Sequence, residues 1–440
     1  MTELPRTSAA SDPRQFSASG PSAKAGRLWI ILAVSLLFML TNPLEFVIKG
    51  IVPGAQALSD PTTSRAIYPN VMLQMMVKAG VLAGFLFLAA PGWRLVPVVL
   101  RRAPLPFAFL VYAIASRTWS DTPGSTTTDL IYLATALTAG TALAVRFDAE
   151  ELARIIGYTG VVIAFMSIIM IVLFPTYGVH SPAEAAQGDL AGAWRGVYLQ
   201  KNMLGQVMAT LFAIYLLNGR ELLGSRARQA AALVVTLALV AGTRSASAFA
   251  LLVLCTGASI TLFVLSRFTQ IIVALLAPIL LVIVGALSGA VLSALGRGTD
   301  MSGRAFIWQA AGRMIAERPW FGYGYGSALM GGFTPYIIGR FKAQNAHNGY
   351  IDMALSTGMV GSLLFYGALA IAMVWAVQSR DAGGPNMLLA TTLGTFIVGW
   401  LIAAFSEVML RPNMPMGSLG IASLVVLSCL GLDRGKVGAR

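Results

Sequence analysis

The stretch QNAHNGYIDM, residues 344–353, contains His347, one of only two histidines among the 440 residues. An accessible imidazole exchanges protons near neutral pH without special tuning, so it is suited to general-base catalysis. The neighbouring Asn345 and Asn348 are suited to orient the ring or to bind ligand hydroxyl groups. These residues alone leave three interpretations open: a catalytic base, a metal ligand, or a polar side chain at a membrane boundary.

A metal site is disfavoured, because metal ions need several converging ligands. The second histidine, His180, lies in a different loop, and no H-x-x-x-H or paired-carboxylate pattern accompanies either histidine. Cys255 and Cys429 both lie inside apolar runs, which suits neither a disulfide framework nor a metal site. Nucleotide-loop, zinc-protease and calcium-loop patterns are absent from the sequence as well. We therefore predict no metal and no cofactor.

Two cations bracket a short aromatic stretch in AWRGVYLQKNMLGQ, residues 193–206. They are Arg195 and Lys201, and Asn202 follows directly. Gly205 in the same stretch permits close helix packing. Interfacial anchoring explains aromatic and basic residues at a membrane edge, but ligand binding by the cations is an equally open interpretation.

A third cation, Arg244, interrupts an apolar run in GTRSASA, residues 242–248. A charge at this place must face a cavity, an interface or a partner. Ser245 and Ser247 are suited to cap the helix that follows. The segment therefore predicts a tight hinge between two helices that also presents Arg244.

The segment 296–349 is the longest stretch between apolar runs, and it contains Arg304. Within RAFIWQAAGRMI, apolar residues recur at helical spacing, which predicts a short amphipathic helix near the membrane surface. The alternation of Gly322, Gly324 and Gly326 fails as a nucleotide loop, because its spacing is G-x-G-x-G and no strand precedes it. We expect a tight turn instead, on which Tyr323 and Tyr325 are displayed to sugars or lipid headgroups.

The elements that must position these residues are membrane spans. The chain is 57% hydrophobic and only 11% charged, whereas soluble proteins carry roughly a quarter charged residues. Because about 20 apolar residues cross a bilayer as a helix, the fold class is an all-α integral membrane protein with about twelve transmembrane helices and one long periplasmic loop. The predicted spans are 28–48, 69–91, 104–117, 129–145, 155–174, 203–218, 229–243, 246–265, 269–295, 350–377, 386–406 and 414–432.

The distribution of basic residues predicts the orientation. With the N-terminus in the cytoplasm, 17 of the 31 Lys and Arg residues face the cytoplasm; outside the long loop only 7 face outward. This division gives a cytoplasmic tail 1–27, spans over 28–295, a periplasmic loop 296–349, spans over 350–432, and a cytoplasmic tail 433–440. Nucleic-acid binding is not required by the net charge of +13, because excess Lys and Arg in a membrane protein mostly set topology.

This orientation places the candidate cations and His347 on one outward face. Arg binds phosphate bidentately and Lys adds a point charge, so a lipid with a phosphate head is the ligand class that fits. If the phosphate leaves during reaction, the same cations stabilise the charge that develops. A histidine nearby would take the proton of an attacking hydroxyl. The inferred chemistry is glycosyl transfer from a polyprenyl diphosphate donor, without ATP or metal.

Four ordered pieces carry a family resemblance: RGVYLQKNMLG, TRSASA, GRAFIWQAA with PWFGYGYGS, and NAHNGYIDMALSTGMVG, which extend from residue 195 to 361. With them the chain resembles the superfamily of O-antigen ligases and polysaccharide polymerases, and most of all its ExoQ-type exopolysaccharide polymerases. The stretch SRTWS, residues 116–120, also fits this subfamily. Many relatives carry a histidine directly before the Lys-Asn pair, where this chain has Gln200.

The resemblance implies roles for individual residues. Arg195, Arg244 and Lys201 match basic positions expected to hold the donor diphosphate. His347 matches the loop histidine proposed as catalytic base or as the group that positions the acceptor. Arg304 matches a position for which a structural role is equally open. Together with the residues themselves, the resemblance gives catalytic His347 and Arg244 and a substrate-binding set of Arg195, Lys201, Asn202, Arg304, Asn345 and Asn348.

The expected function is an inner-membrane polysaccharide polymerase that joins undecaprenyl-diphosphate-linked repeat units at the periplasmic face. The first alternative is an O-antigen ligase that transfers the glycan to a lipid A core. A flippase or transporter for lipid-linked sugars is the second alternative, but it predicts internal repeats and polar groups along a path through the membrane. The expected partners are the lipid-linked donor, the glycan acceptor, membrane lipid, a chain-length regulator and a flippase, and no nucleic acid.

Overall fold

The computed structural model describes residues 23–48, 71–182, 190–265, 304–327, 346–379 and 383–431. Within these ranges the chain is helical, with no strand and one isolated bridge between Val179 and Trp194. The helices are α1 (Ala23–Leu40), α2 (Glu45–Ile48), α3 (Val71–Ala89), η1 (Ala90–Leu95), α4 (Val96–Arg102), α5 (Pro104–Ser116), α6 (Pro123–Arg146), α7 (Ala149–Leu173), α8 (Pro175–Gly178), α9 (Lys201–Leu223), α10 (Arg226–Thr243), α11 (Ala246–Phe263), α13 (Arg304–Glu317), α15 (Gly349–Ser379), α16 (Gly384–Ala403) and α17 (Pro415–Ser428).

A helix occupies each predicted span that falls within the described residues, and only the predicted span 269–295 lies outside them. By length and composition, six described segments are long and apolar enough to cross a membrane, namely Met72–Arg102, α6, α7, α11, α15 and α16. The result is an all-α membrane protein with multiple spans. The number of twelve spans and the orientation of the termini stay predictions.

The first span is shorter than expected. The sequence predicted apolar helix over 28–48, but α1 ends at Leu40. Asn42 and Leu44 adopt left-handed backbone conformations with φ of 55° and 56°, and Pro43 between them has no backbone N–H to donate. These three residues stop the helix and turn the chain, whose Leu44 N–H donates to the carbonyl of Val197 at 2.7 Å.

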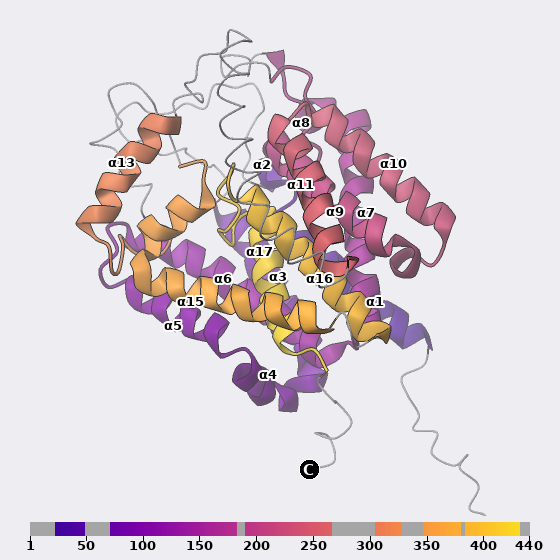
Figure 1. Cartoon of the computed structure of the whole chain (residues 1–440), viewed down its shortest axis with the longest axis horizontal. Coiled ribbons are helices and arrows are strands. Elements are labelled where there is room, and N and C mark those ends of the chain that lie inside the picture. The colour runs from indigo at the N-terminus through magenta and orange to yellow at the C-terminus, as the bar shows by residue number, and fades with distance from the viewer. Residues whose placement is uncertain are drawn as a thin grey trace, which may run out of the picture.

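Helix α9 lies at the centre of one half of the bundle and packs against α7, α10, α11 and α16. Gly205 allows its close approach to α11, because a Cβ there would lie 2.5 Å from the Cβ of Ala248. This confirms the packing role predicted for Gly205 from the sequence. In the other half, α6 packs against α3 and α17, as Figure 1 lets the reader follow.

A separate layer of structure covers one end of the bundle. It contains α13, the turn 318–327 and the first turns of α15, and α13 lies at the edge of the molecule away from α4 (Figure 1). The predicted amphipathic helix is confirmed as α13, whose apolar side chains Ile307, Ala311 and Met314 are buried. α15 is kinked at Gly358, where φ is 59° and ψ is −162°.

The display of Tyr323 and Tyr325 predicted from the sequence is wrong. Their exposed fractions are only 5% and 4%, whereas Trp320, three residues before Tyr323, is 60% exposed. The cause is the glycine alternation, because Gly322, Gly324 and Gly326 all have positive φ and let the turn press its backbone against neighbouring helices. The two tyrosines therefore point inward and serve packing.

Candidate functional site

The N-terminus of α9 carries two of the predicted site residues. Lys201 is its first residue, and the Lys201 backbone N–H donates to Nε2 of His180 at 3.2 Å. Asn202 lies one residue further and bridges two other elements. Its Nδ2 donates to Oε1 of Glu407 at 2.8 Å, and its Oδ1 accepts from the hydroxyl of Ser245 at 2.8 Å. The Asn202 amide thus ties α9 to the segments after α16 and before α11.

His347 lies directly before α15 and faces the same glutamate. Nδ1 of His347 is 3.3 Å from Oε2 of Glu407. The imidazole is 38% exposed and the carboxylate 15% exposed, so the pair opens toward solvent on the histidine side. The backbone of His347 is left-handed, with φ of 47°, which is uncommon for a residue with a side chain. Such local conformations cluster at functional sites.

Arg244 lies between α10 and α11, where the sequence predicted a hinge. It is the C-cap of α10 with φ of 50°, and its side chain is exposed. Nη1 of Arg244 donates to the carbonyl of Ala191 at 3.4 Å. Ser245 follows as N-cap of α11 and accepts from the N–H of Ala248, which confirms the predicted cap. Arg244 is therefore next to the residue that contacts Asn202.

Arg195 is placed differently from Arg244. Its exposed fraction is 4%, and the guanidinium donates to two backbone carbonyls, from Nε to Tyr177 at 2.7 Å and from Nη2 to Thr176 at 3.1 Å. These contacts hold the chain after α7 against the segment that leads into α9. Arg195 thus fixes the backbone of the segment that precedes α9.

The remaining predicted residues divide into two groups. Asn348 is nearly buried, and its Oδ1 accepts from the N–H groups of Tyr350 and Ile351 at 2.9 and 3.1 Å, so it caps α15. Arg304 begins α13, but its side chain lies outside the described residues, as does all of Asn345. Nδ2 of Asn348 donates to the carbonyl of Phe405 at 3.4 Å, which joins the start of α15 to the segment that carries Glu407.

Sequence reasoning missed Glu407 as a member of the site. The sequence showed it only as one of few acids near a helix end, and no spacing rule connects it with His347, 60 residues earlier. His180 was considered only as a metal ligand, yet it accepts a hydrogen bond at the start of α9. Within the described part of the chain, no three His, Cys, Asp or Glu side chains gather as a metal site.

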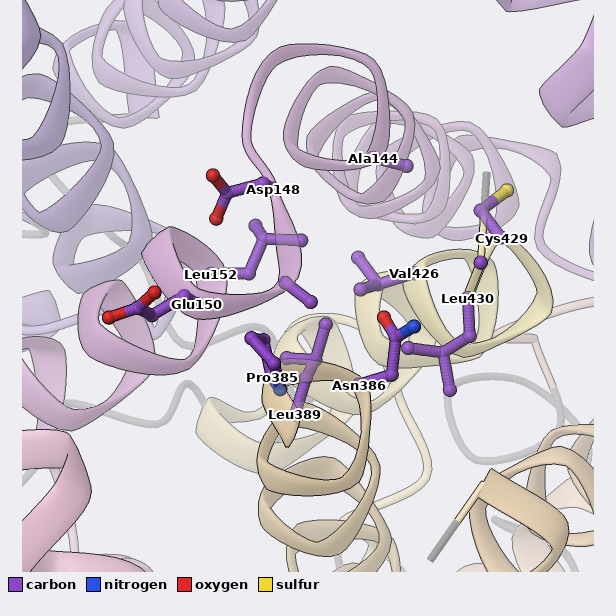
Figure 2. A pocket seen from close by; sticks show the side chains of 12 residues that line it. Ala144, Asp148, Glu150, Leu152, Pro385, Asn386, Leu389, Val426, Cys429 and Leu430 are labelled. Atoms are coloured by element: carbon purple, nitrogen blue, oxygen red, sulfur yellow. The ribbon is translucent and has the colours of Figure 1, made fainter. Parts of the chain in front are cut away.

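A cavity of about 440 Å³ opens at the other end of α16 (Figure 2). Pro385, Asn386 and Leu389 from the start of α16 line it, with Asp148 and Glu150 on the facing wall. The candidate residues lie beyond the C-terminal end of the same helix, where Glu407 follows Ala403. The cavity and the candidate site are therefore separate features at opposite ends of α16.

The assembled site joins four segments of the chain. A line of polar contacts runs from Ser245 through Asn202 and Glu407 to His347, with Arg244 and Lys201 next to it. The arrangement presents an imidazole beside a carboxylate, and the cations Arg244 and Lys201 are the chain neighbours of Ser245 and Asn202 in the same line of contacts. It is suited to remove a proton from a hydroxyl group and to bind an anion next to it.

Comparison with known proteins finds similarity in the part of the chain that contains Arg244 and His347. Residues 231–366 match the O-antigen ligase family. Over 340 residues the chain is also 26% identical to the exopolysaccharide production protein ExoQ of Rhizobium meliloti (strain 1021), an alignment that covers 71% of this chain and 74% of that protein. Both the helices and the sequence indicate a multi-pass membrane protein. Residues 231–366, which include Arg244 and His347, are thus similar to the O-antigen ligase family, and the chain as a whole is similar to ExoQ.

Proposed function

We propose that this protein is a polysaccharide polymerase that joins lipid-linked repeat units at the outer face of the inner membrane. The donor is an oligosaccharide on undecaprenyl diphosphate, and the acceptor is a sugar hydroxyl of another lipid-linked chain. The family and the relative support glycosyl transfer in general, by a membrane polymerase or ligase. The identity of the donor, the identity of the acceptor and the outward orientation of the site are what we propose beyond that general activity.

The observation that carries the proposal is the contact between His347 and Glu407. With Nδ1 of His347 directed at the carboxylate, the neutral tautomer that donates from Nδ1 carries its lone pair on Nε2. A carboxylate that orients an imidazole in this way also stabilises the imidazolium formed after proton transfer. His347 is therefore suited to take the proton of the acceptor hydroxyl.

The bond changes balance without a further reactant. The acceptor oxygen forms a bond to the anomeric carbon of the donor, while the bond from that carbon to the diphosphate oxygen breaks. The electron pair of the broken bond leaves with the lipid diphosphate, and the hydroxyl proton passes to His347. Arg244, which is exposed beside Ser245, and Lys201 at the start of α9 are assigned to the developing negative charge.

Arg195 receives a supporting role in this scheme. Its Nε and Nη2 donate to the carbonyls of Tyr177 and Thr176, so its first effect is to fix the loop before α9. Through that loop it positions Lys201 and Asn202. Direct contact with the diphosphate, which the family resemblance implies for Arg195, stays a prediction.

A ligase is the second candidate, because the matching family is described as O-antigen ligase. The two activities share the donor and differ in the acceptor. Reconstitution in liposomes separates them, with a defined undecaprenyl-diphosphate oligosaccharide as the only glycan substrate. Chain growth without lipid A, ATP or added metal is expected from a polymerase. Transfer only after a lipid A core is added would replace the polymerase with the ligase.

Arg244→Ala tests the anion-binding part of the proposal. The exposed Arg244 side chain has little to do with folding, so the variant should insert normally and lose chain growth by about 10²-fold or more. Arg220→Ala, at the last turn of α9 on the opposite end, is the matched control. Full-length polymer from Arg244→Ala at wild-type rate would remove Arg244 from the diphosphate site.

A further inference from the structure

Two chain segments meet at the candidate histidine. One is residues 346–352, which begin α15, and the other is residues 404–411, which follow α16. Their backbones are joined directly, because the N–H of Gly349 donates to the carbonyl of Ala404 at 2.7 Å. The absence of a side chain at Gly349 permits this approach, since a Cβ there would lie 3.2 Å from the Cβ of Ala404.

A buried ion pair joins the same two segments at their far ends. Nε of Arg411 donates to Oδ2 of Asp352 at 2.6 Å, and Nη2 of Arg411 donates to Oδ1 at 2.8 Å. The side chains are 14% and 5% exposed. Asp352 lies five residues after His347 and Arg411 lies four residues after Glu407. The ion pair thus lies four to five residues away from the His347–Glu407 contact along each of the two segments.

The surroundings of the pair contain a second carboxylate, Asp129 on α6, and the phenol of Tyr325. Asp129 is 6% exposed and Tyr325 4% exposed, and both act electrostatically on Arg411. Burial lowers the pKa of the Arg411 guanidinium, but Asp352 and Asp129 reverse this and leave the pKa above its ordinary value. Arg411 therefore stays charged, and Asp129 would remain beside it if Asp352 lost its charge.

A short, bidentate guanidinium–carboxylate pair fixes both distance and orientation. The contact of His347 with Glu407 joins only one atom pair at 3.3 Å, so it fixes the distance and the orientation of the two side chains less strictly. Stability alone is a weak reason for the buried pair, because apolar residues often replace such pairs without loss. Its place on the two segments that carry His347 and Glu407 gives it a different purpose.

We propose that Arg411 and Asp352 are positioning residues, which hold the start of α15 and the turn after α16 in the register that brings His347 to Glu407. This inference rests on the proposed function of the same site, and it adds two residues to which no catalytic contact is assigned. It predicts an effect on turnover and little effect on donor binding, because Lys201 and Arg244 lie on other segments.

The first test is Asp352→Asn in reconstituted full-length protein. The variant removes the charge and keeps the size, and Asp129 remains as counter-charge for Arg411. We expect kcat to fall by about 10- to 100-fold, the loss typical when a residue that orients a metal-bound side chain is removed, with KM for the donor within about threefold. Asp352→Glu should recover most of kcat. Wild-type kcat in Asp352→Asn would overturn the proposal.

The matched control is Asp121→Asn. Asp121 forms an ion pair of 2.9 Å with Arg318 across the same outer layer, but these side chains are 32% and 45% exposed. Surface pairs of this kind contribute little, and this one touches neither of the two segments. We expect Asp121→Asn to keep kcat within about twofold. A loss equal to that of Asp352→Asn would show a general sensitivity of the layer and overturn the specific assignment.

The second test replaces the ion pair by a covalent bond between the segments. Gly349→Cys with Ala404→Cys places two Cβ atoms 3.2 Å apart, so the segments must move apart by a few tenths of an ångström to reach the separation of about 3.5–4.5 Å found in disulfides. The native Cys255 and Cys429, both buried, are changed to Ala throughout. In the Asp352→Asn background, oxidation should restore kcat to within about threefold of the parent, and reduction should remove the gain. A formed disulfide without any gain in kcat would contradict a positioning role.

The rate of disulfide formation gives a measurement that does not depend on activity. If Arg411 and Asp352 hold the segments together, the cysteine pair should oxidise several-fold more slowly in the Asp352→Asn background than in the parent. Equal rates would contradict the proposal even if the parent elongates no glycan. Absence of elongation by the parent would instead contradict the proposed function, so the two failures are distinguishable.

Discussion

Two polar pairs join the same two segments of the chain, and they differ in nearly every physical respect. His347 and Glu407 meet through one atom pair at 3.3 Å, and the imidazole is partly exposed. Arg411 and Asp352 meet through two short hydrogen bonds and are shielded from solvent. The imidazole of the first pair is accessible to a reacting group. The second pair holds a guanidinium and a carboxylate in a fixed geometry.

The difference teaches how a site can be both reactive and ordered. Removing one partner of a buried ion pair costs about 3–5 kcal/mol, because the remaining charge is left without compensation. An exposed pair costs far less to break, about 0–1 kcal/mol. The rigid pair thus lies a few residues away from the imidazole on the same two segments, and the imidazole itself stays partly exposed. Substitutions at His347, Glu407 and Ser245 test this division, in order of decreasing expected effect on rate.

The largest effect is expected from His347. Loss of a general base costs on the order of 10² to 10⁴ in rate, so His347→Ala should reduce chain growth by that amount in reconstituted protein. His347→Asn is the matched variant, because Asn tolerates the left-handed conformation at this position but is no base. Both variants should show the same loss. Wild-type turnover in either one would reduce His347 to a structural residue.

A smaller effect is expected from Glu407. Glu407→Gln keeps an oxygen for the amide of Asn202 and removes the negative charge that faces His347. We expect a fall in kcat of about 10- to 100-fold with normal membrane insertion. Glu407→Asp keeps the charge and should lose less. If Glu407→Gln and Glu407→Asp have equal activity, the charge is not what orients the imidazole.

The smallest effect is expected from Ser245. Ser245→Ala removes the cap of α11 and the hydroxyl that contacts Asn202. Loss of an N-cap costs about 1 kcal/mol, and we expect the rate to fall by about three- to tenfold. Ser225→Ala is the control. It removes the N-cap of α10, at the end of α10 far from Ser245, and should lower stability without lowering the rate. Equal rate losses in Ser245→Ala and Ser225→Ala would show that Ser245 affects the rate only through stability.

Much of the fold is predictable from the sequence, because membrane spans obey a simple length rule. The spans at 104–117 and 246–265 agree with α5 and α11 to within two residues at each end. The hinge at Arg244 and the cap Ser245 were also predictable from the sequence, because a cap depends on residues only a few positions apart. α1 ends early because Asn42 and Leu44 leave the helical conformation, which hydropathy does not report.

The site is less predictable, because its contacts span long distances along the chain. Asn202 and Glu407 lie 205 residues apart, and no local pattern connects them. Tyr323 and Tyr325 were expected at the surface, since aromatic residues beside glycines in an outer loop are typical of display. Their burial depends on the shape of α15 and α6, against which the turn packs. Tertiary packing thus decides which polar and aromatic residues are accessible.

The kink of α15 has a consequence for which substitutions the chain accepts. A Cβ at Gly358 would lie 2.5 Å from the backbone of Trp320, and one at Gly322 would lie 2.5 Å from the carbonyl oxygen of Leu355. Both glycines also have positive φ, so neither position accepts another residue unless the opposing backbone withdraws. We therefore expect the two positions to change together, because a side chain at either one pushes the turn and α15 apart. A sequence that keeps both glycines is expected to keep this contact between the turn and α15.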